Sequence, residues 1–330
     1  MGNKKKFLDW NMVLALILIF ELIIFGIKTP NILKPMILFN GIVDYMPVLI
    51  ISLFVTFVFI TGNMDIQVAS IVGLTSIIIG VLWQDFGFNI FIASVIGVLA
   101  AGICGLLSGF LIAYGNVQSM VITLGGSFLY SGVALLLSTL SSTKSYQGIS
   151  GFPDSFKFIG KSKLFGVIPF QFVLFILLAI LAYILLHKTK FGRKVYLVGV
   201  NPNAAHYSGI NVKKIIVLTF VLSAISAGIS GVILTSYLGT AKSDLGITLT
   251  MDIITAVVLG GTLSTGGIGS IAGTFLSGLI LAIFRFGMTI SFGVSAQYLD
   301  IPIGILLLIV VIIQTFMIHP ELLKKRRLKM

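Results

Sequence analysis

Runs of about 20 apolar residues follow one another along this chain, separated by short polar segments, and an apolar run of that length is what a helix needs to cross a lipid bilayer. Because the second and third runs nearly merge and the eighth is short, a count of nine or eleven fits as well as ten. The sequence therefore predicts an all-α integral membrane protein with about ten transmembrane helices. The ten runs are 11–27, 42–61, 66–83, 88–114, 120–140, 169–187, 215–238, 249–261, 268–287 and 298–318.

Composition excludes the main alternatives. Of the 330 residues 57% are hydrophobic and 10% are charged, whereas soluble domains carry about 25% charged residues. The apolar runs are too long to be barrel strands. No stretch resembles a soluble domain, so residues 1–330 are predicted to form one membrane domain. The single cysteine, Cys104, lies in an apolar run, which excludes an internal disulfide and a cysteine metal cluster, and we predict no metal site.

The net charge of +12 results from basic residues at the ends of apolar runs, where they orient a membrane protein rather than bind nucleic acid. With ten spans, the segments on one side hold fourteen of the 22 basic residues: three near the N-terminus, six in loop 188–214 and five near the C-terminus. The positive-inside rule then predicts that both termini and this loop are cytoplasmic. The first run lacks a small-residue cleavage site, so we expect it to be a retained span.

The longest strongly polar stretch, 191–214, contains the signature of a short helix. Asn201 is suited to the N-cap, Pro202 to the first helical position and Gly209 to a left-handed stop. Two helical turns are not stable alone in water, so this helix needs a surface, which we predict a partner protein to supply. The predicted partner-binding residues are Asn201, Pro202, Asn203, Ala204, Ala205, His206, Tyr207, Ser208 and Gly209.

A second polar interruption, residues 62–70, separates two apolar runs. Ionisable residues at membrane depth are functional candidates because burying them is costly, and a helix broken at Gly62 would present free N–H groups near Asn63 and Asp65. The alternative is that Asp65 caps the third span at the inner surface. The candidate residues for a translocation path are Asn63, Asp65, Gln67, Thr123, Ser243 and Asp244.

The remaining ionisable residues have simpler interpretations. Asp252, like Ser243 and Asp244, is predicted to cap the start of the eighth span, with lining of the outer mouth as the alternative. Asp300 is predicted to be a helix-start residue, and Arg285 to snorkel or form an ion pair. Glu21 is predicted to make a hydrogen bond facing the protein. The three histidines, His187, His206 and His319, are interpreted as solvated surface residues, and we predict no catalytic residue.

Two further features concern packing and the outer surface. Glycines inside the spans are interpreted as sites of close helix packing. The long loop 141–168, predicted to lie outside, is either a connector or a surface on which a short helix receives a solute-binding protein.

Four motifs resemble the membrane permeases of bacterial ATP-binding-cassette (ABC) importers, ribose and monosaccharide branch, and the resemblance covers almost the whole chain. They are GNMDIQVAS at 62–70, SGFLIAYGNVQSMVITLGG at 108–126, GRKVYLVGVNPNAAHYSGINV at 192–212 and DIITAVVLGGTLSTGGIGSIAGT at 252–274. The finer pattern, SYQGISGFP at 145–153 and SYLGTAKSDLG at 236–246, is most similar to the second permease of autoinducer-2 importers, with rhamnose-type permeases close behind.

The resemblance implies a type II permease bundle, as in vitamin-B12 and ribose importers, located in the bacterial cell membrane. It also implies three partners: a second permease subunit, a cytoplasmic ATPase and an extracytoplasmic solute-binding protein. ATP and Mg²⁺ would be bound by the ATPase, and this chain would bind no cofactor. The family's coupling segment carries Glu-Ala-Ala followed by Gly, whereas this chain has Asn203-Ala204-Ala205 and Gly209, so the acidic residue is missing.

The implied cargo is a monosaccharide or a furanosyl signal molecule, with autoinducer-2 favoured. A branched-chain amino acid, carried by a permease of the same fold, is the second choice. A secondary transporter driven by an ion gradient would carry ionisable residues deep in several spans, whereas here they gather near span ends. A lipid-linked glycosyl transferase would need a loop with clustered acids or histidines, and none appears.

Overall fold

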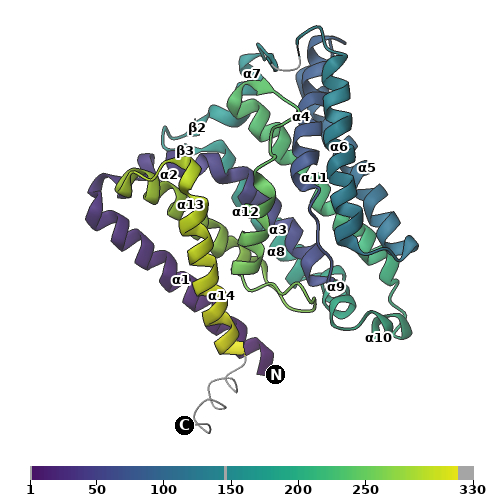
Figure 1. Ribbon diagram of the computed structural model, residues 1–330, viewed down its shortest axis with the longest axis vertical. Helices are drawn as coiled ribbons and strands as arrows, with labels where there is room; N and C mark the ends of the chain where they lie inside the picture. The colour runs from purple at the N-terminus through teal and green to yellow at the C-terminus, as the bar shows by residue number, and fades with distance from the viewer. Residues whose placement is uncertain (1, 145–146, 319–330) are drawn as a thin grey trace.

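The computed structural model describes residues 2–144 and 147–318, and they form a bundle of helices with four two-residue strands (Figure 1). In chain order, the first half contains α1 (Gly2–Lys28), η1 (Pro30–Leu33), α2 (Pro35–Ile42), η2 (Val43–Tyr45), α3 (Met46–Ile60), α4 (Val68–Gln84), α5 (Ile90–Gly115), α6 (Ser119–Thr139), β1 (Ile149–Ser150), α7 (Asp154–Lys161), β2 (Lys163–Leu164) and β3 (Ile168–Pro169).

The second half contains α8 (Phe170–His187), α9 (Lys190–Val200), α10 (Pro202–Tyr207), α11 (Val212–Leu238), β4 (Thr240–Ala241), α12 (Leu249–Leu259), α13 (Ile271–Phe292), η3 (Ala296–Tyr298) and α14 (Asp300–Ile318). Each of the ten predicted spans has a helix. Among the described residues, seven helical segments have the length and composition to cross a membrane, and α4, α12 and most of α14 are shorter apolar helices. The predicted all-helical membrane fold with about ten spans is confirmed.

Helix α3 lies at the centre of the bundle. Every one of its residues is buried, and it contacts α8, α11, α12 and α13. A helix that is apolar on all sides can face either lipid or other helices in a membrane protein. Here the surrounding helices bury α3 on every side. In Figure 1, α1 and α13 lie on one side of α3, and α4, α5, α6 and α11 lie on the other.

The long helices α5 and α11 pack against each other and approach closely through small residues. A Cβ atom placed on Gly105 would lie 2.5 Å from the Phe220 carbonyl oxygen and 2.5 Å from the Ala224 Cβ. Gly228 of α11 faces Ala101 of α5 in the same way. The packing role predicted for glycines is therefore correct here. It does not hold on α6 at Gly125, where an added Cβ would meet no atom within 4 Å.

The predicted outer loop 141–168 is more than a connector, because it contains a helix that docks on the bundle. The Gly160 N–H of α7 donates to Ser236 Oγ of α11 at 2.8 Å, and Phe156 is completely buried. Strand β1 pairs antiparallel with β4, which follows α11, and β2 pairs with β3. The short helix expected in this loop is confirmed.

Helices α9 and α10 lie at the opposite end of the bundle from α7, at the same end as the start of α1 and the end of α14 (Figure 1). This agrees with the predicted arrangement in which loop 188–214 shares a side with both termini. The basic cluster predicted near the C-terminus, and His319, lie outside the described residues.

We expect Gly105→Ala to destabilise the protein by about 1–3 kcal/mol, because the new methyl group meets a backbone carbonyl that cannot move away without separating α5 from α11. The matched control is Gly132→Ala on α6, where a Cβ meets no atom within 4 Å and the higher helix propensity of alanine favours folding by up to about 1 kcal/mol. Thermal unfolding of the purified protein in detergent measures both. Equal midpoints for the two variants would contradict the packing argument.

Candidate functional site

Helix α10 forms where the sequence predicts it. The Asn201 side-chain oxygen accepts hydrogen bonds from the backbone N–H groups of Asn203, at 3.0 Å, and Ala204, at 3.1 Å. Pro202 occupies the first turn, and Gly209 ends the helix with a φ of +77°. These contacts satisfy backbone donors that a two-turn helix otherwise leaves open, so α10 has a defined shape before any partner binds.

The chain itself supplies part of the surface that α10 needs. Ala205 is buried, and the Ile210 N–H bonds back to its carbonyl at 3.1 Å. The other α10 residues face outward, and Tyr207 is 90% exposed. The expectation that a partner supplies the whole surface is therefore wrong for one face, and the opposite face remains free among the described residues.

Helix α9, which precedes α10, was not predicted. Its buried face consists of Val195 and Val198, while lysines and arginine cover the other face, and the Thr189 hydroxyl accepts a bond from the Gly192 N–H at 3.2 Å. The basic residues made the segment look like a loop. The three-residue spacing of the two valines was the available helix signal.

Helix α9 also connects α10 to the bundle. The Tyr196 hydroxyl donates to the Gly269 carbonyl at 2.7 Å, just before α13 begins. The Gly267 N–H donates to the Ile60 carbonyl at 2.8 Å, at the end of α3. His187 is half-buried, and its Nε2 accepts from the Ile271 N–H at 3.4 Å, so its interpretation as a solvated residue is wrong.

A cavity of about 710 Å³ lies beside α10, between the end of α5 and the start of α11. Its wall includes Tyr114, over whose ring the Lys213 ammonium lies 4.9 Å from the centroid. His206, the remaining described histidine, also lines this cavity and is exposed. The cavity gives the α10 end of the bundle a concave surface next to a protruding helix.

The helix break predicted at Gly62 is present, with a φ of +77° at that residue. The N–H groups that it frees bind side chains of the protein. The Met64 N–H donates to Ser119 Oγ at 3.1 Å, and the Gln67 N–H donates to one Asp65 carboxylate oxygen at 3.3 Å. These two N–H groups are therefore satisfied within the protein and are not free to bind a solute.

Asp65 is completely buried, and Ser223 of α11 donates to its second carboxylate oxygen at 2.8 Å. Ser223 lies about three turns into α11, so Asp65 is enclosed by helices and is not a cap at the bundle surface. Gln67 is also buried, and its side-chain oxygen accepts from Ser108 at 2.7 Å.

The structure brings four of the predicted path residues together at this break. Thr123 is buried and donates to the Ser119 carbonyl at 2.9 Å, and half-buried Asn63 donates to the Thr61 hydroxyl at 3.0 Å. The other two predicted path residues lie elsewhere: Ser243 is half-buried beside α4, where its carbonyl faces Gly73, and Asp244 is exposed.

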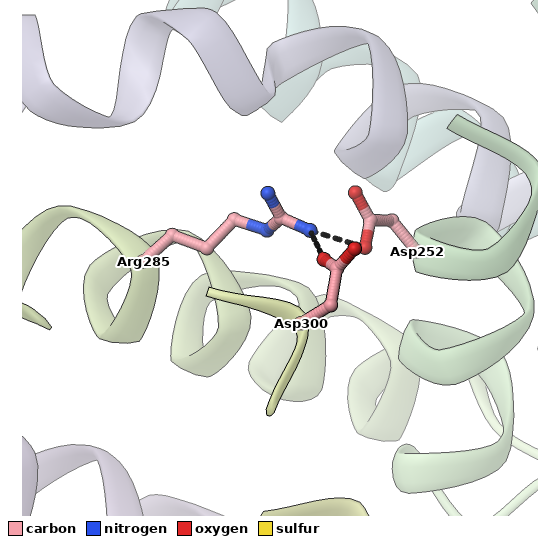
Figure 2. Close-up of polar contacts among 3 residues, drawn as sticks. All are labelled: Asp252, Arg285 and Asp300. Carbon is pink, nitrogen blue, oxygen red and sulfur yellow. Dashed lines mark hydrogen bonds and ion pairs between the residues drawn. The ribbon is translucent and has the colours of Figure 1, made fainter. Parts of the chain in front are cut away.

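An open pocket of about 810 Å³ lies between α4, α6, α12, α13 and α14. Figure 2 shows its charged group: one guanidinium nitrogen of Arg285 lies 2.8 Å from Asp252 and 3.0 Å from Asp300. Its other polar lining residues are Ser70, Ser127, Ser131, Thr248, Thr250 and Gln297.

The sequence anticipated this group only in part. The ion pair predicted for Arg285 is confirmed. Asp252 and Asp300 lie in the first turns of α12 and α14, as predicted, and they are also the partners of Arg285. A cation in an apolar helix needs partners, and that was the available signal. Glu21 differs from expectation: its side chain is buried, and neither carboxylate oxygen has a hydrogen-bond partner among the side chains that the structure describes.

Helices long enough to cross a membrane, a protruding helix at one end and a polar pocket toward the other describe a polytopic membrane protein. The family model described as "Branched-chain amino acid transport system / permease component" matches residues 37–311, and the chain belongs to this permease family.

Curated relatives extend the match to nearly the full length. The chain is 37% identical over 311 residues to the autoinducer 2 import system permease protein LsrD of Salmonella paratyphi A, covering 94% of this chain and 93% of the relative. It is 36% identical over 314 residues to LsrD of Yersinia pestis strain Pestoides F, covering 95% and 93%. The predicted ABC importer permease is confirmed.

We expect Ser223→Ala to destabilise the fold by about 1–3 kcal/mol, because it removes a donor from the buried Asp65 carboxylate. Ser226→Ala is the matched control: that serine lies on the same helix, is equally buried and donates only to the Ser223 carbonyl among the bonds described. Chemical denaturation in detergent compares the two. If Ser226→Ala lowered the free energy of unfolding as much as Ser223→Ala does, a special role for the contact with Asp65 would be contradicted.

Proposed function

We propose that this chain is a membrane subunit of an ATP-driven importer, that a cytoplasmic ATPase binds its α10, and that its cargo is autoinducer 2. The ATPase binds ATP and Mg²⁺, a second permease subunit completes the translocation path, and an extracytoplasmic binding protein delivers the cargo. The chain itself performs no catalysis.

The observation that carries the coupling role is the construction of α10. Its cap and its buried Ala205 fix its position, while Tyr207 is almost fully exposed. An exposed aromatic residue on a rigid helix is a typical interface hot spot. Tyr196 of α9 donates a hydrogen bond to Gly269, and Gly267 of the same loop before α13 donates to Ile60 at the end of α3. A force on α10 therefore has a route through α9 to α13 and α3.

The absence of an acidic residue at position 203 changes how the ATPase is held. Asn203 is exposed, and its side chain offers an amide rather than a carboxylate. The contact at this position is therefore a neutral hydrogen bond, and the tyrosine contributes more of the binding free energy.

Basic residues support a cytoplasmic location of the α10 end. Loop 188–214 carries six of them, and α10 lies at the same end as the start of α1 (Figure 1). The polar pocket then opens toward the outer half, and the α7 segment, with Phe158 and Phe165 exposed, faces the outside as the docking surface for the binding protein.

The relatives named above support autoinducer 2 as cargo, since they cover more than nine-tenths of the chain. The description of the matching family model favours branched-chain amino acids as the second candidate. An uptake assay separates the two candidate cargoes. Cells that lack their own autoinducer 2 permease are supplied with this chain and with its ATPase, second permease and binding protein. Restored autoinducer 2 uptake supports the proposal, and restored leucine uptake alone would replace it with the second candidate.

We expect Tyr207→Ala to weaken retention of the ATPase by roughly thirtyfold, which corresponds to about 2 kcal/mol for loss of an interface hot spot. Transport falls with it while the permease still folds, since Tyr207 makes few contacts with its own chain. Phe165→Ala, which removes an equally exposed aromatic residue at the other end, is the control. Co-purification with the tagged ATPase is the measurement, and equal retention by both variants would contradict α10 as the docking helix.

A further inference from the structure

The polar pocket contains three charged side chains from three helices: Asp252 of α12, Arg285 of α13 and Asp300 at the start of α14. All three line the cavity of about 810 Å³. They carry one positive and two negative charges, so the group has a net charge of −1 when all are ionised.

The two ion pairs of Arg285 differ in exposure. The Asp252 side chain is 13% exposed, whereas that of Asp300 is 84% exposed. Exposed ion pairs contribute little to stability because water and salt screen them, while a partly buried pair is held more strongly. Asp300 is therefore the partner that an entering molecule can displace from Arg285, and Asp252 is the partner that stays.

Arg285 has donors to spare. Both ion pairs use the same terminal nitrogen, and no hydrogen bond from the other terminal nitrogen is found among the described residues. Nε is buried, so a molecule in the pocket does not reach it. A guanidinium has five N–H donors in a planar fork, so the second terminal nitrogen can bind a further acceptor inside the pocket.

Hydroxyl groups complete the lining. Ser131 donates to Ser70 at 3.0 Å, joining α6 to α4, and Ser127 donates to the carbonyl of Leu124 on its own helix. Thr250 contacts the Ile66 carbonyl at a long 3.4 Å. Each hydroxyl oxygen that donates can still accept, so the wall offers donors and acceptors together.

We propose that this pocket is where cargo contacts the chain, and that it selects neutral, hydroxyl-rich molecules: Asp252 accepts from cargo hydroxyls, Arg285 donates to cargo oxygens, and Asp300 is displaced. This proposal rests on the proposed import function and specifies its contact residues. An anionic cargo would add to the net negative charge of the group, and the carboxylate of a zwitterionic amino acid would have to compete with Asp252 for a cation that is already paired.

The test places one reactive thiol in the pocket of the assembled importer. Thr250→Cys adds a cysteine at the lining, while the native Cys104 is buried and serves as the internal background. The rate of maleimide labelling is measured in the presence of autoinducer 2, ribose, ribose 5-phosphate or leucine, each at millimolar concentration. We expect autoinducer 2 and ribose to slow labelling and the other two to leave it unchanged.

Second-site variants in the Thr250→Cys background identify the contacts. Asp252→Asn and Arg285→Gln should raise the concentration of autoinducer 2 needed for protection by roughly tenfold or more, the usual effect of losing a hydrogen bond to a charged group. Asp300→Asn makes the net charge of the three side chains zero, so ribose 5-phosphate should then bind in the pocket and slow maleimide labelling. Asp44→Asn, which removes an exposed carboxylate of η2 that does not line the pocket, is the matched control and should change nothing.

The outcomes separate this inference from the proposed function. If autoinducer 2 is imported but no sugar slows labelling, the pocket is not the contact site and the inference fails while the function stands. Protection by leucine alone overturns the selectivity for hydroxyl-rich cargo. Protection by ribose 5-phosphate before any substitution overturns the charge argument. If this chain with its partners imports no autoinducer 2, the proposed cargo fails, whatever the labelling shows.

Discussion

Lipid cannot form hydrogen bonds with a polypeptide backbone, so a helix that stops among other helices inside a membrane must have its free N–H groups satisfied by protein. The segment between α3 and α4 meets this requirement with side chains: Ser119 accepts from Met64, and Asp65 accepts from Gln67. Asp65 is held in turn by Ser223. These bonds tie the segment between α3 and α4 to α6 and α11.

The same break, at Gly62, lies two residues beyond Ile60, where the end of α3 contacts the loop before α13. The Ile60 carbonyl, at the end of α3, accepts from Gly267, while Tyr196 of α9 bonds Gly269. Force applied to α10 therefore reaches the end of α3 and the start of α13 through hydrogen bonds and close glycine contacts. Packed helices with such contacts move as units rather than deform continuously. The α13 helix carries Arg285 nearer its other end, which links the coupling segment to the polar pocket through a single helix.

Local chemistry made much of the fold predictable. Apolar length alone located a helix for each predicted span, and the cap, proline and glycine around residues 201–209 located α10, because these signals act within a few residues. Helix α9 was missed since its charged face hid a narrow apolar one. The break at Gly62 was predicted, and burial of Asp65 was one of two alternatives. The sequence could not decide between them, because the residue that holds Asp65, Ser223, is 158 residues away.

The pocket was the least predictable feature. Asp252, Arg285 and Asp300 each have a local explanation as a helix-end or snorkelling residue, and only the packing of α12, α13 and α14 brings them together. Ser243, Asp244 and Asp252 were all considered for the outer mouth because they are polar and near the start of a span, yet of these only Asp252 lines the pocket, together with Thr250. A pattern of residues shows which side chains are polar, but the helix rotation that decides what they face is set by distant contacts.

The central claim is that the bundle has no energy source of its own and is driven through α10. Its most direct test is accumulation of autoinducer 2 in proteoliposomes containing this chain, its second permease and the binding protein, with and without the ATPase and ATP. The account predicts accumulation above the external concentration only when both ATPase and ATP are present. Accumulation against the gradient without the ATPase would contradict it.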